Sequence, residues 1–484
     1  MNDFFERKRM IDSIISIVEA YEPMRNAIVL AAGKGTRMHS DVPKVLHEVC
    51  GVPMVELIVN TLKQAGAERV VTVTGFGHEM VESRLEGQCE FALQEPQLGT
   101  GHAVMQAKQL EGESGITVVV NGDVPCIRQE TFEKLFLSCE EADMVVLTVK
   151  LEDPKAYGRI VREKDGSVQK IVEYKDCSEE EKTIKEINTG IYAFKNELLF
   201  THGKEIKNDN AQQEYYITDL VELFKQAGHV VQAVEIEDPF EVQGVNDNVE
   251  LAKANATMRK RINESWMRKG VTMVNPDATY IGPYVTFGKD VVLHPNVYLY
   301  GKTSIKDGTT ILPQSYLDNA IIGSRTIINA SEITDSEVKD DCKIGPYTHF
   351  RNGCIVEDKN RVGNFVEFKN VHFGVDSRCA HLTYLGDSDV GSKVNIGCGV
   401  ITVNYDGANK YHTTIKDGAF VGSNSNLIAP VTIGENAVVA AGSTATIDVP
   451  DGDMAISRVR QENKEGYGKF YLERNRKKKA ESKK

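Results

Sequence analysis

The chain has 484 residues, of which 41% are hydrophobic and 26% charged, and it carries a net charge of −13. One hydrophobic core rarely grows beyond about 250–300 residues, so this length predicts two or three soluble domains. The acidic balance argues against a nucleic-acid partner, and no apolar run approaches the ~20 residues of a membrane span. Nine scattered cysteines without a CxxC pair argue against a disulfide scaffold or a zinc ribbon and favour a cytoplasmic protein.

Residues 1–23 are predicted to form a helical N-terminal extension. Their apolar side chains at positions 4, 11, 14, 15 and 18 fall on one stripe of a helix. Charged residues interrupt the apolar positions, which excludes a secretory signal. The stripe predicts a packing surface, either on the first domain of this chain or on a partner, and the sequence leaves both alternatives open.

Residues 24–247 alternate between strand-like and helical patterns. Apolar runs at 27–32, 70–74, 116–120 and 144–150 are typical of buried strands, and 54–64 is typical of an amphipathic helix. This alternation predicts an α/β, Rossmann-like domain whose mostly parallel sheet has helices on both faces. Ligands of such sheets bind at the carboxyl ends of the strands. Residues 248–270 are charged and favour a helix, which predicts a linker helix that contains the only tryptophan, Trp266.

Residues 271–457 follow a six-residue period. An aliphatic or aromatic residue recurs every six positions from Ile281 to Leu317, from Val338 to Phe368, and again from Ile415 to Val439. This period is typical of an all-β parallel β-helix. The repeats resemble those of the hexapeptide acyltransferases, which implies a left-handed helix with three hexapeptides per coil.

Two segments interrupt this period, at 369–389 and 403–414, and both are expected to be loops that leave the coil. Beyond the repeats, residues 458–484 form a basic tail. We expect this tail to be solvated, to dock in part on a neighbouring coil, and to have irregular final residues.

A glycine-rich turn, LAAGKGTRM, follows the first predicted strand. Gly33 and Gly35 would let backbone N–H groups approach a phosphate chain, and Arg37 and Lys44 would supply positive charge to it. The spacing matches neither a P-loop nor the GxGxxG fingerprint of dinucleotide-binding proteins. On composition alone, a tight turn with solvated basic residues is an equal alternative.

Longer motifs decide between these alternatives. LAAGKGTRM, PKVLHEVCG, LQEPQLGTGHAV and NGDVP occur in this order and resemble the sugar-1-phosphate nucleotidyltransferases. Together with EINTGIY, NDNAQQEYYITD, AHLTYLGD and NYDGANK, they make about residues 26–465 similar to the bacterial bifunctional N-acetylglucosamine-1-phosphate uridylyltransferase/glucosamine-1-phosphate acetyltransferases.

The resemblance implies two transferase reactions. The first is acetyl-CoA-dependent N-acetylation of glucosamine 1-phosphate. The second is Mg²⁺-dependent uridylyl transfer from UTP to N-acetylglucosamine 1-phosphate, which releases pyrophosphate and makes UDP-N-acetylglucosamine for peptidoglycan and lipopolysaccharide. It also implies a cytoplasmic homotrimer.

For uridylyl transfer, the resemblance implies that Arg37 and Lys44 bind the triphosphate and that Asp123 and Asn246 hold Mg²⁺. Magnesium prefers oxygen ligands and commonly takes only one or two from protein beside substrate phosphates. Asn121 stands where an aromatic residue is frequent in the family. The residues implied to bind UTP or the UDP-sugar are Leu30, Ala31, Ala32, Gly33, Lys44, Gln94, Gln97, Gly99, Thr100, Gly158, Glu173, Asn188, Tyr216, Thr218 and Asn246.

Two basic residues of the repeats, Arg351 and Lys369, each follow a phenylalanine and lie 18 residues apart. With three hexapeptides per coil, they are expected to stack on one face. Stacked like charges are destabilising, so a bound anion would compensate them. The resemblance implies that this anion is the phosphate of glucosamine 1-phosphate, and basic side chains that extend into solvent are the alternative.

His381, in AHLTYLGD, is the predicted general base of acetyl transfer, because a neutral imidazole can accept the proton of the attacking amine. A structural histidine is the alternative from the residue alone. Cys398 stands where a small alanine is expected in the family. The resemblance implies that Tyr384 and Asn395 hold the sugar, with Glu367 orienting charge nearby, and that acetyl-CoA contacts Cys398, Asn404, Tyr405, Lys410, Ser423, Ala441 and Arg458.

Two other functions belong to different classes. A single-activity nucleotidyltransferase would use its β-helix only for structure or regulation, and an inactive scaffold would lack Arg37, Lys44 or Asp123. Residues implied for both reactions are present, which favours the bifunctional enzyme. Zinc is disfavoured, because the spacing of the available histidines forms no recognisable ligand set; these are His349, His372 and His381.

Overall fold

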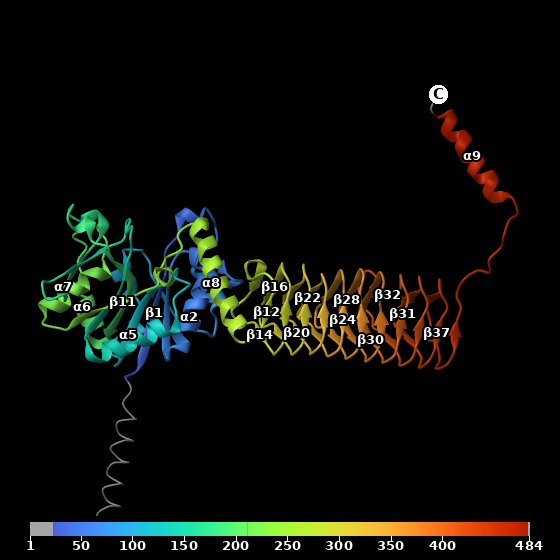
Figure 1. Ribbon diagram of the computed structural model, residues 1–484, viewed down its shortest axis with the longest axis horizontal. Coiled ribbons are helices and arrows are strands. Elements are labelled where there is room, and N and C mark those ends of the chain that lie inside the picture. Colours follow the sequence, from blue (N-terminus) through green and yellow to red (C-terminus); the bar gives the residue numbers. More distant parts are fainter. Residues whose placement is uncertain (1–22, 211, 483–484) are drawn as a thin grey trace, which may run out of the picture. The chain divides into compact units, whose positions relative to one another are not determined.

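The computed structural model describes residues 23–210 and 212–482, and it divides the chain into two compact units that meet between Ile262 and Asn263 (Figure 1). The predicted N-terminal extension therefore lies, apart from Pro23, outside the described residues. None of the described helices is long and apolar enough to cross a membrane. Each unit is built around its own sheet or sheets.

The first unit contains a nine-stranded sheet in the order β11-β7-β10-β6-β1-β4-β5, with β8 and β9 joined at one side through β10. β1, β4, β5 and β6 run parallel, whereas β10 runs antiparallel to β6 and β7. The strands are β1 (Arg25–Ala31), β4 (Arg69–Thr74), β5 (Glu90–Leu93), β6 (Ile116–Asn121), β7 (Met144–Lys150), β8 (Arg159–Arg162), β9 (Val168–Val172), β10 (Glu186–Lys195) and β11 (Val231–Ile236).

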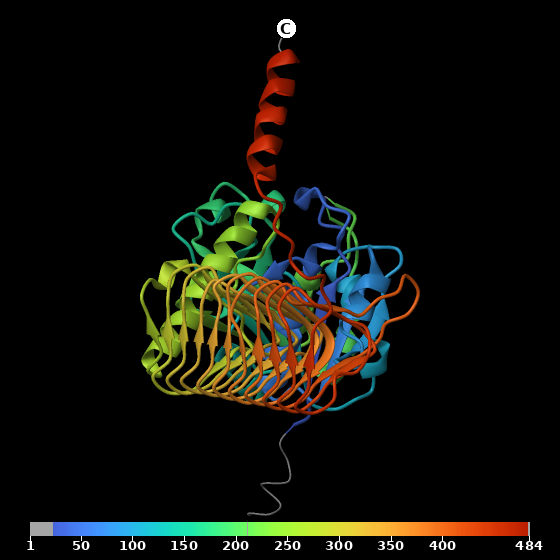
Figure 2. The ribbon, with the colours of Figure 1, turned by 90° about the vertical axis from the view of Figure 1, so that its right-hand side faces the viewer.

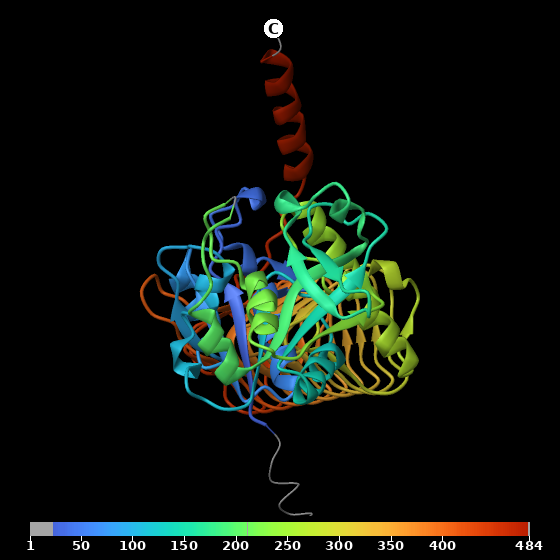
Figure 3. The same ribbon diagram turned by 90° about the vertical axis from the view of Figure 1, so that its left-hand side faces the viewer.

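Helices cover both faces of this sheet, as Figure 3 shows from the side of the first unit. Successive residues of a strand point to opposite faces, so Val29 packs with Ile58 and Phe136 while Ile28 packs with Val104 and Phe224. Burial on both faces explains the unbroken apolar run of β1. The helices are α2 (Met54–Gln64), α3 (His78–Arg84), α4 (Thr100–Val104), α5 (Gln129–Glu141), α6 (Asn196–Gly203) and α7 (Leu220–Gln226).

Helix α8 (Asn248–Arg268) contains the boundary between the units. In its first half, the main-chain oxygens of Ala254 and Asn255 accept hydrogen bonds from the thiols of Cys126 and Cys50. In its second half, the Asn263 amide donates to the main-chain oxygens of Pro276 and Thr279 at 2.8 and 3.0 Å. Each end of α8 is thus anchored within its own unit.

The second unit is a parallel β-helix whose coils follow one behind the next (Figure 2). One wall is an 11-stranded sheet from β12 (Thr272–Met273) to β39 (Met454–Ala455), and a 17-stranded sheet from β13 (Thr279–Ile281) to β38 (Thr444–Ala445) forms the rest. In regular coils Val292 pairs with Thr310, 18 residues further on. The strands closest to the candidate site are β24 (Lys343–Ile344), β25 (Thr348–Arg351), β28 (Val366–Phe373), β29 (Arg378–Cys379), β30 (Thr383–Val390), β31 (Asn395–Ile396), β32 (Ile401–Val403) and β33 (Thr413–Ile415).

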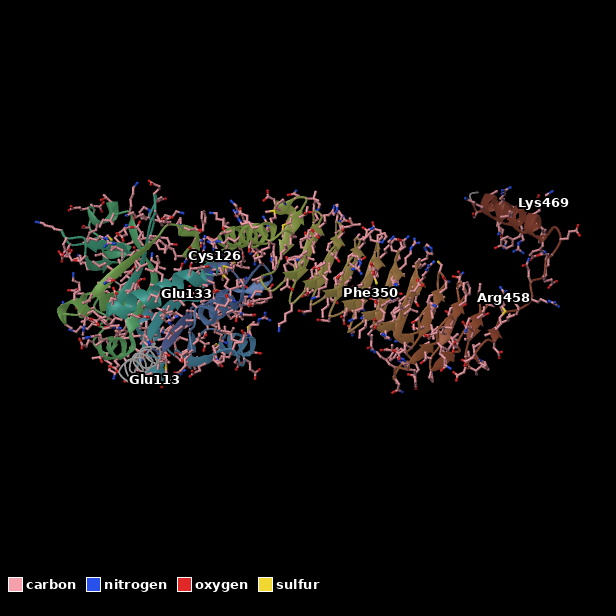
Figure 4. The ribbon with its side chains drawn as sticks, turned by 60° about the horizontal axis from the view of Figure 1, so that its bottom comes forward. Glu113, Cys126, Glu133, Phe350, Arg458 and Lys469 are labelled. Atoms are coloured by element: carbon pink, nitrogen blue, oxygen red, sulfur yellow. The ribbon has the colours of Figure 1, made fainter. Side chains whose placement is uncertain are left out.

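Lead residues of the repeats fill the interior of the coils. Phe350, labelled in Figure 4, is fully buried and stacks on Phe368 with ring centroids 5.0 Å apart. At one corner the chain needs glycine, because Gly345 has a φ of +94° and a Cβ there would lie 1.9 Å from the main-chain oxygen of Asn329. The six-residue period of the sequence thus corresponds to a continuous column of apolar side chains inside the coils.

The prediction of a loop at 369–389 is wrong. This segment stays in the coil as the end of β28, β29 and most of β30, and residues of β28 and β30 pair in parallel along it. The buried Phe368 and Phe373 are five residues apart rather than six, as are Leu385 and Val390. A five-residue unit shifts the phase of the repeat without ejecting the chain. The second interruption does leave the coil, between β32 and β33.

The final part of the tail is not irregular up to Glu481, because Tyr467–Glu481 forms helix α9, whereas residues 483–484 lie outside the described residues. This helical segment contains four lysines, two arginines and two glutamates, which favour helices, and it has no proline. None of its described side chains is buried. Arg458, which Figure 4 labels past the last coil, and the residues that follow it up to α9 are exposed.

Candidate functional site

A cavity of about 350 Å³ opens at the carboxyl ends of β1, β5 and β6. The register of β1 and β6 places Leu30 beside Asn121, and the glycine-rich turn follows directly after β1. The predicted residues that line this cavity are Leu30, Ala31, Ala32, Gly33, Lys44, Gln94, Gln97, Gly99, Thr100 and Asp123, together with Val45, Ala103, Asn121 and Glu214.

Four predicted residues meet at one side of this cavity. The Lys44 Nζ atom lies 2.5 Å from Asp123 Oδ2 and 3.3 Å from Asn246 Oδ1. Arg37 donates to the same Asn246 oxygen at 2.8 Å. Gly35, with a φ of +63°, permits this approach, because a Cβ there would lie 2.5 Å from the Lys44 Cβ. Two cationic side chains and two oxygen donors therefore form one cluster.

These oxygens suit a magnesium ion. Asp123 and Asn246 supply one carboxylate and one amide oxygen, and both are within reach of a single cation, the Lys44 ammonium. Glu250 accepts a hydrogen bond from the Asn246 backbone N–H at 2.8 Å, which fixes the second donor. Within the described residues no group of three or more His, Cys, Asp or Glu forms a metal cage. Such a sparse donor set is typical of Mg²⁺ bound together with substrate phosphates.

A second cavity, of about 230 Å³, adjoins the first. Leu30, Thr100 and Asn121 line both cavities. Among the predicted residues Gly158, Glu173, Asn188 and Thr218 line the second one, together with Ala156, Tyr157, Thr189, Gly190, Tyr192 and Ile217. The two cavities thus bring the nucleotide and sugar residues of the prediction side by side.

Tyr216 is the predicted sugar residue that does not line either cavity. Its hydroxyl instead accepts a hydrogen bond from Gln212 at 2.6 Å. Glu173 does line the second cavity, and burial raises the pKa of its carboxyl, with Asp176 and Asp219 adding to the effect. The cavity therefore holds a carboxyl group that takes up a proton more readily than one in water.

Several residues that line the cavities were not predicted from the motifs. Thr189 and Gly190 belong to EINTGIY and directly follow the predicted Asn188, so their position was a usable signal. Asn121, which lines both cavities, was noted only as a departure from the family. Tyr157 lies outside the motifs, and its place in the cavity lining depends on where β7 ends and β8 begins.

On the β-helix, Arg351 and Lys369 pair directly in the register of β25 and β28, as the 18-residue spacing predicts. Arg351 donates to Glu367 Oε1 at 2.5 and 3.1 Å, so a carboxylate of the neighbouring coil balances one of the two cations. Contact with Lys410 is the main cause that lowers the pKa of Lys369, and Asp387 acts in the opposite direction. The positive charge open to an anion therefore lies at Lys369 and Lys410.

His381 lies in the corner between β29 and β30, not in an ejected loop, and its side chain is exposed. Tyr384 pairs with Glu367 in the register of β28 and β30, and both lie in the same wall as Arg351 and Lys369. Asn395 belongs to β31 of the 11-stranded sheet and so stands on another wall. The structure places His381, Tyr384 and the phosphate-binding candidates on neighbouring coils.

The loop 404–412 carries three predicted acetyl-CoA residues. Tyr405 and Lys410 form an antiparallel bridge across it, and the Asn404 amide donates to Asp387 Oδ2 at 2.6 Å. Tyr405 itself is exposed. Cys398, Ser423 and Ala441 each come two residues after Ile396, Val421 and Val439, which pair across three successive coils. They therefore line one corner of the prism, whereas Arg458 follows the last strand.

Comparisons with known proteins agree with this two-part structure. The Nucleotidyl transferase family model matches residues 26–256, and the Bacterial transferase hexapeptide (six repeats) model matches residues 412–446. Curated relatives described as "Bifunctional protein GlmU" are 48% identical over 98% of the protein in Halalkalibacterium halodurans, 51% over 97% in Geobacillus thermodenitrificans, and 49% over 99% in an Exiguobacterium species. Each alignment covers 92% of this chain.

The fold and its two sites define a transferase that joins a nucleotidyltransferase to a hexapeptide-repeat acyltransferase. More particularly, the chain belongs to the family of bifunctional GlmU proteins. The predicted family, the predicted fold class and the prediction of a bifunctional enzyme are thereby confirmed.

Proposed function

We propose that the first unit transfers a uridylyl group from UTP to N-acetylglucosamine 1-phosphate, and that the second unit makes this sugar phosphate from glucosamine 1-phosphate and acetyl-CoA. The observation that carries the proposal is the cluster of Arg37, Lys44, Asp123 and Asn246 at the edge of two adjoining cavities. It provides cations and metal-binding oxygens where a triphosphate and a sugar phosphate would meet.

In uridylyl transfer, a phosphate oxygen of the sugar attacks the α-phosphorus of UTP. The bond from this phosphorus to the bridging oxygen breaks, and pyrophosphate leaves with the electron pair. The attacking oxygen is already anionic, so the protein need not supply a nucleophile, and positioning and charge neutralisation carry the catalysis. Arg37 and Lys44 neutralise the triphosphate. Asp123 and Asn246 would hold Mg²⁺, which supplies further charge neutralisation when bound.

In acetyl transfer, the neutral amine of glucosamine 1-phosphate attacks the thioester carbonyl of acetyl-CoA. His381 accepts the amine proton, and the carbon–sulfur bond breaks to release the thiol of CoA. Lys369 and Lys410 bind the phosphate together with Arg351. Glu367 holds the Arg351 guanidinium in place. Tyr384 and Asn395 hold the sugar. Cys398, Ser423 and Ala441 form the corner along which acetyl-CoA binds, with Arg458 at its end.

We also propose a homotrimer that works in the cytoplasm. Exposed apolar side chains occur at successive corners next to His381: Tyr347, Phe365 and Leu382 are 55%, 61% and 61% exposed. A neighbouring subunit that covers these corners would bring two of its own parts to the site. These are its loop 404–412 and the wall that carries its Asn395. The nine cysteines, all unpaired, suit a reducing compartment.

The experiment that tests this function is a substrate-omission assay on the purified chain with glucosamine 1-phosphate, acetyl-CoA, UTP and Mg²⁺. We expect UDP-N-acetylglucosamine only in the complete mixture. Without UTP, N-acetylglucosamine 1-phosphate should accumulate, and EDTA should stop pyrophosphate release while acetyl transfer continues. Uridylyl transfer without any acetyl transfer would instead support a single-activity nucleotidyltransferase.

A further inference from the structure

Arg159 is a buried cation next to the second cavity, which holds the proposed sugar residues and is called the sugar cavity below. It belongs to β8 and is only 2% exposed. No carboxylate of the described residues forms an ion pair with it, whereas Arg162 of the same strand pairs with Glu186 at 2.6 Å. A buried charge without a partner of opposite sign is costly, so the contacts of this guanidinium must offset the cost.

The guanidinium binds the main chain of one loop, residues 154–157. Its Nη2 atom donates to the Lys155 carbonyl at 2.9 Å. Its Nη1 atom donates to the Tyr157 carbonyl and, at 3.5 Å, to the Pro154 carbonyl. Lys155 has a φ of +45°, a left-handed conformation that a lysine rarely adopts. Three carbonyls that share one cation explain how the loop stays in this unfavourable conformation.

The same loop lines the sugar cavity. Ala156 and Tyr157 belong to the lining, as does Gly158 directly after them. The Gly158 carbonyl accepts a hydrogen bond from the Asn188 backbone N–H at 2.9 Å. A Cβ at Gly158 would lie 3.5 Å from both carboxyl oxygens of Glu173. The loop therefore ends against two residues that are proposed to hold the sugar.

Arg159 also contacts the segment that carries Glu173. Its Cζ atom lies 5.4 Å from the ring centroid of Tyr174, the residue after Glu173. This distance is typical of a cation–π contact. One side chain thus joins two segments that border the sugar cavity, the loop 154–157 and the turn after β9.

We infer that Arg159 is a positioning residue of the sugar cavity, because it fixes the loop 154–157 in the shape that lines this cavity. This inference rests on the proposed uridylyl transfer. Without the guanidinium, three carbonyls lose their donor and nothing holds the left-handed turn at Lys155, so the loop should open toward water. The sugar phosphate should then bind more weakly. The triphosphate cluster at Arg37 and Lys44 has no contact with the loop through Arg159 and should be unaffected.

The test measures pyrophosphate release by the full-length chain, with N-acetylglucosamine 1-phosphate and UTP varied in turn. We expect Arg159→Ala to raise KM for the sugar phosphate about tenfold or more and to change KM for UTP by less than about twofold. The substitution leaves a space lined by three carbonyl acceptors. Methylguanidinium at about 20 mM should fill this space and lower KM for the sugar phosphate again about threefold or more.

Arg162→Ala is the matched control. It removes another arginine of β8 and breaks the ion pair with Glu186, so it destabilises the strand without removing the contacts to the loop 154–157. Thermal unfolding compares the stability of the two variants. We expect Arg162→Ala to keep both KM values within about twofold of those of the unmodified chain, and methylguanidinium to have no effect on it.

Arg159→Lys gives the same readout if the alanine variant does not fold. Lysine keeps the charge but offers a single nitrogen, which cannot serve three carbonyls as the planar guanidinium does, so KM for the sugar phosphate should rise about threefold or more. An unchanged KM for the sugar phosphate, an equal rise in both KM values, or a rise of the same size in Arg162→Ala would overturn the inference. Absence of uridylyl transfer in the unmodified chain would instead refute the proposed function, so the two failures are distinguishable.

Discussion

Single charged residues determine what the nucleotide cavity can bind. The Lys44 ammonium contacts both proposed metal ligands, Asp123 and Asn246. Arg37 donates a hydrogen bond to the same Asn246 oxygen. When a triphosphate binds, both cations can turn to its oxygens and leave the two oxygen donors to a metal ion. The cluster therefore contains the components of charge neutralisation before any substrate arrives.

Removing one of these cations should affect only one reaction. We expect Arg37→Ala to lower kcat/KM of uridylyl transfer about 10²–10³-fold, because a charge-stabilising donor is lost in the transition state. Acetyl transfer, at the other unit, should be unchanged. Coupled assays of pyrophosphate and of CoA thiol measure both rates. Arg84→Ala removes an exposed arginine that pairs with Glu56 and should alter neither; a normal uridylyl rate in Arg37→Ala would refute the role of Arg37.

Asp219 is expected to make stability depend on pH. Burial, together with Glu222 and Asp176, raises the pKa of this half-buried carboxyl from 3.8 to about 6. The native state therefore binds a proton that the unfolded state releases, so stability is highest below about pH 4 and falls as the pH rises through 6. Asp219 makes no side-chain capping bond to α7, so Asp219→Asn loses little at low pH.

We therefore expect Asp219→Asn to be more stable than the unmodified chain by about 1 kcal/mol at pH 7.5, a value reduced for the partial exposure of the carboxyl. The difference should vanish near pH 4. Urea unfolding at both values measures it. Asp165, an exposed carboxyl whose pKa is lowered by hydrogen bonds from Ser167, is a control of opposite sign, since Asp165→Asn should not stabilise at pH 7.5. Equal stability of Asp219→Asn and the unmodified chain at pH 7.5 would contradict the assignment.

At the scale of elements, the β-helix explains which parts of the fold could be predicted. The six-residue period reports a buried column of side chains, so the architecture followed from the sequence. A count of six could not identify the five-residue units at Phe368–Phe373 and Leu385–Val390, because the inward direction is set by strand pairing with the next coil. The stacked positions of Arg351 and Lys369 were predictable for the same reason, but the contact between Arg351 and Glu367 was not. It depends on side-chain direction.

In the first unit, too, the sequence could predict the positions of residues along the chain but not the directions of their side chains. Motifs identified the residues that line the nucleotide cavity, since each follows a strand that ends at one edge of the sheet. Tyr216 lies outside the lining of both cavities, because a motif fixes a residue along the chain and not the direction of its side chain. The hydrogen bonds of Gln94 with Gly99 and His102 were equally beyond prediction, because they depend on the turn at Gly99 and on the direction of the His102 ring.

The column of buried rings makes a prediction about the second unit. Phe350→Ala should lower its free energy of unfolding by about 3–5 kcal/mol, because the cavity left beside Phe368 cannot close fully between rigid coils. Thermal unfolding and acetyl transfer should both report the loss. Uridylyl transfer below the transition should persist, since the first unit has its own core. His349→Ala, at the adjacent outward position, should cost little, and a cost as large as that of Phe350→Ala would contradict the proposed packing.

At the scale of the whole molecule, the chain joins two units that each have their own interior and their own site. The residues proposed to bind phosphate and metal in uridylyl transfer all belong to the first unit, and His381, Lys369 and the loop 404–412 belong to the second. The two reactions are linked by chemistry, since the product of acetyl transfer is the substrate of uridylyl transfer. A diffusible intermediate is sufficient for this link.

Complementation of two variants tests this claim most directly. Asp123→Asn should abolish uridylyl transfer and His381→Ala should lower acetyl transfer about 10²–10⁴-fold, each sparing the other reaction. Given glucosamine 1-phosphate, acetyl-CoA, UTP and Mg²⁺, neither variant alone should form UDP-N-acetylglucosamine at an appreciable rate, whereas their mixture should. Loss of both reactions in either single variant, or failure of the mixture although each retains its remaining reaction, would contradict two separate sites connected by a released sugar phosphate.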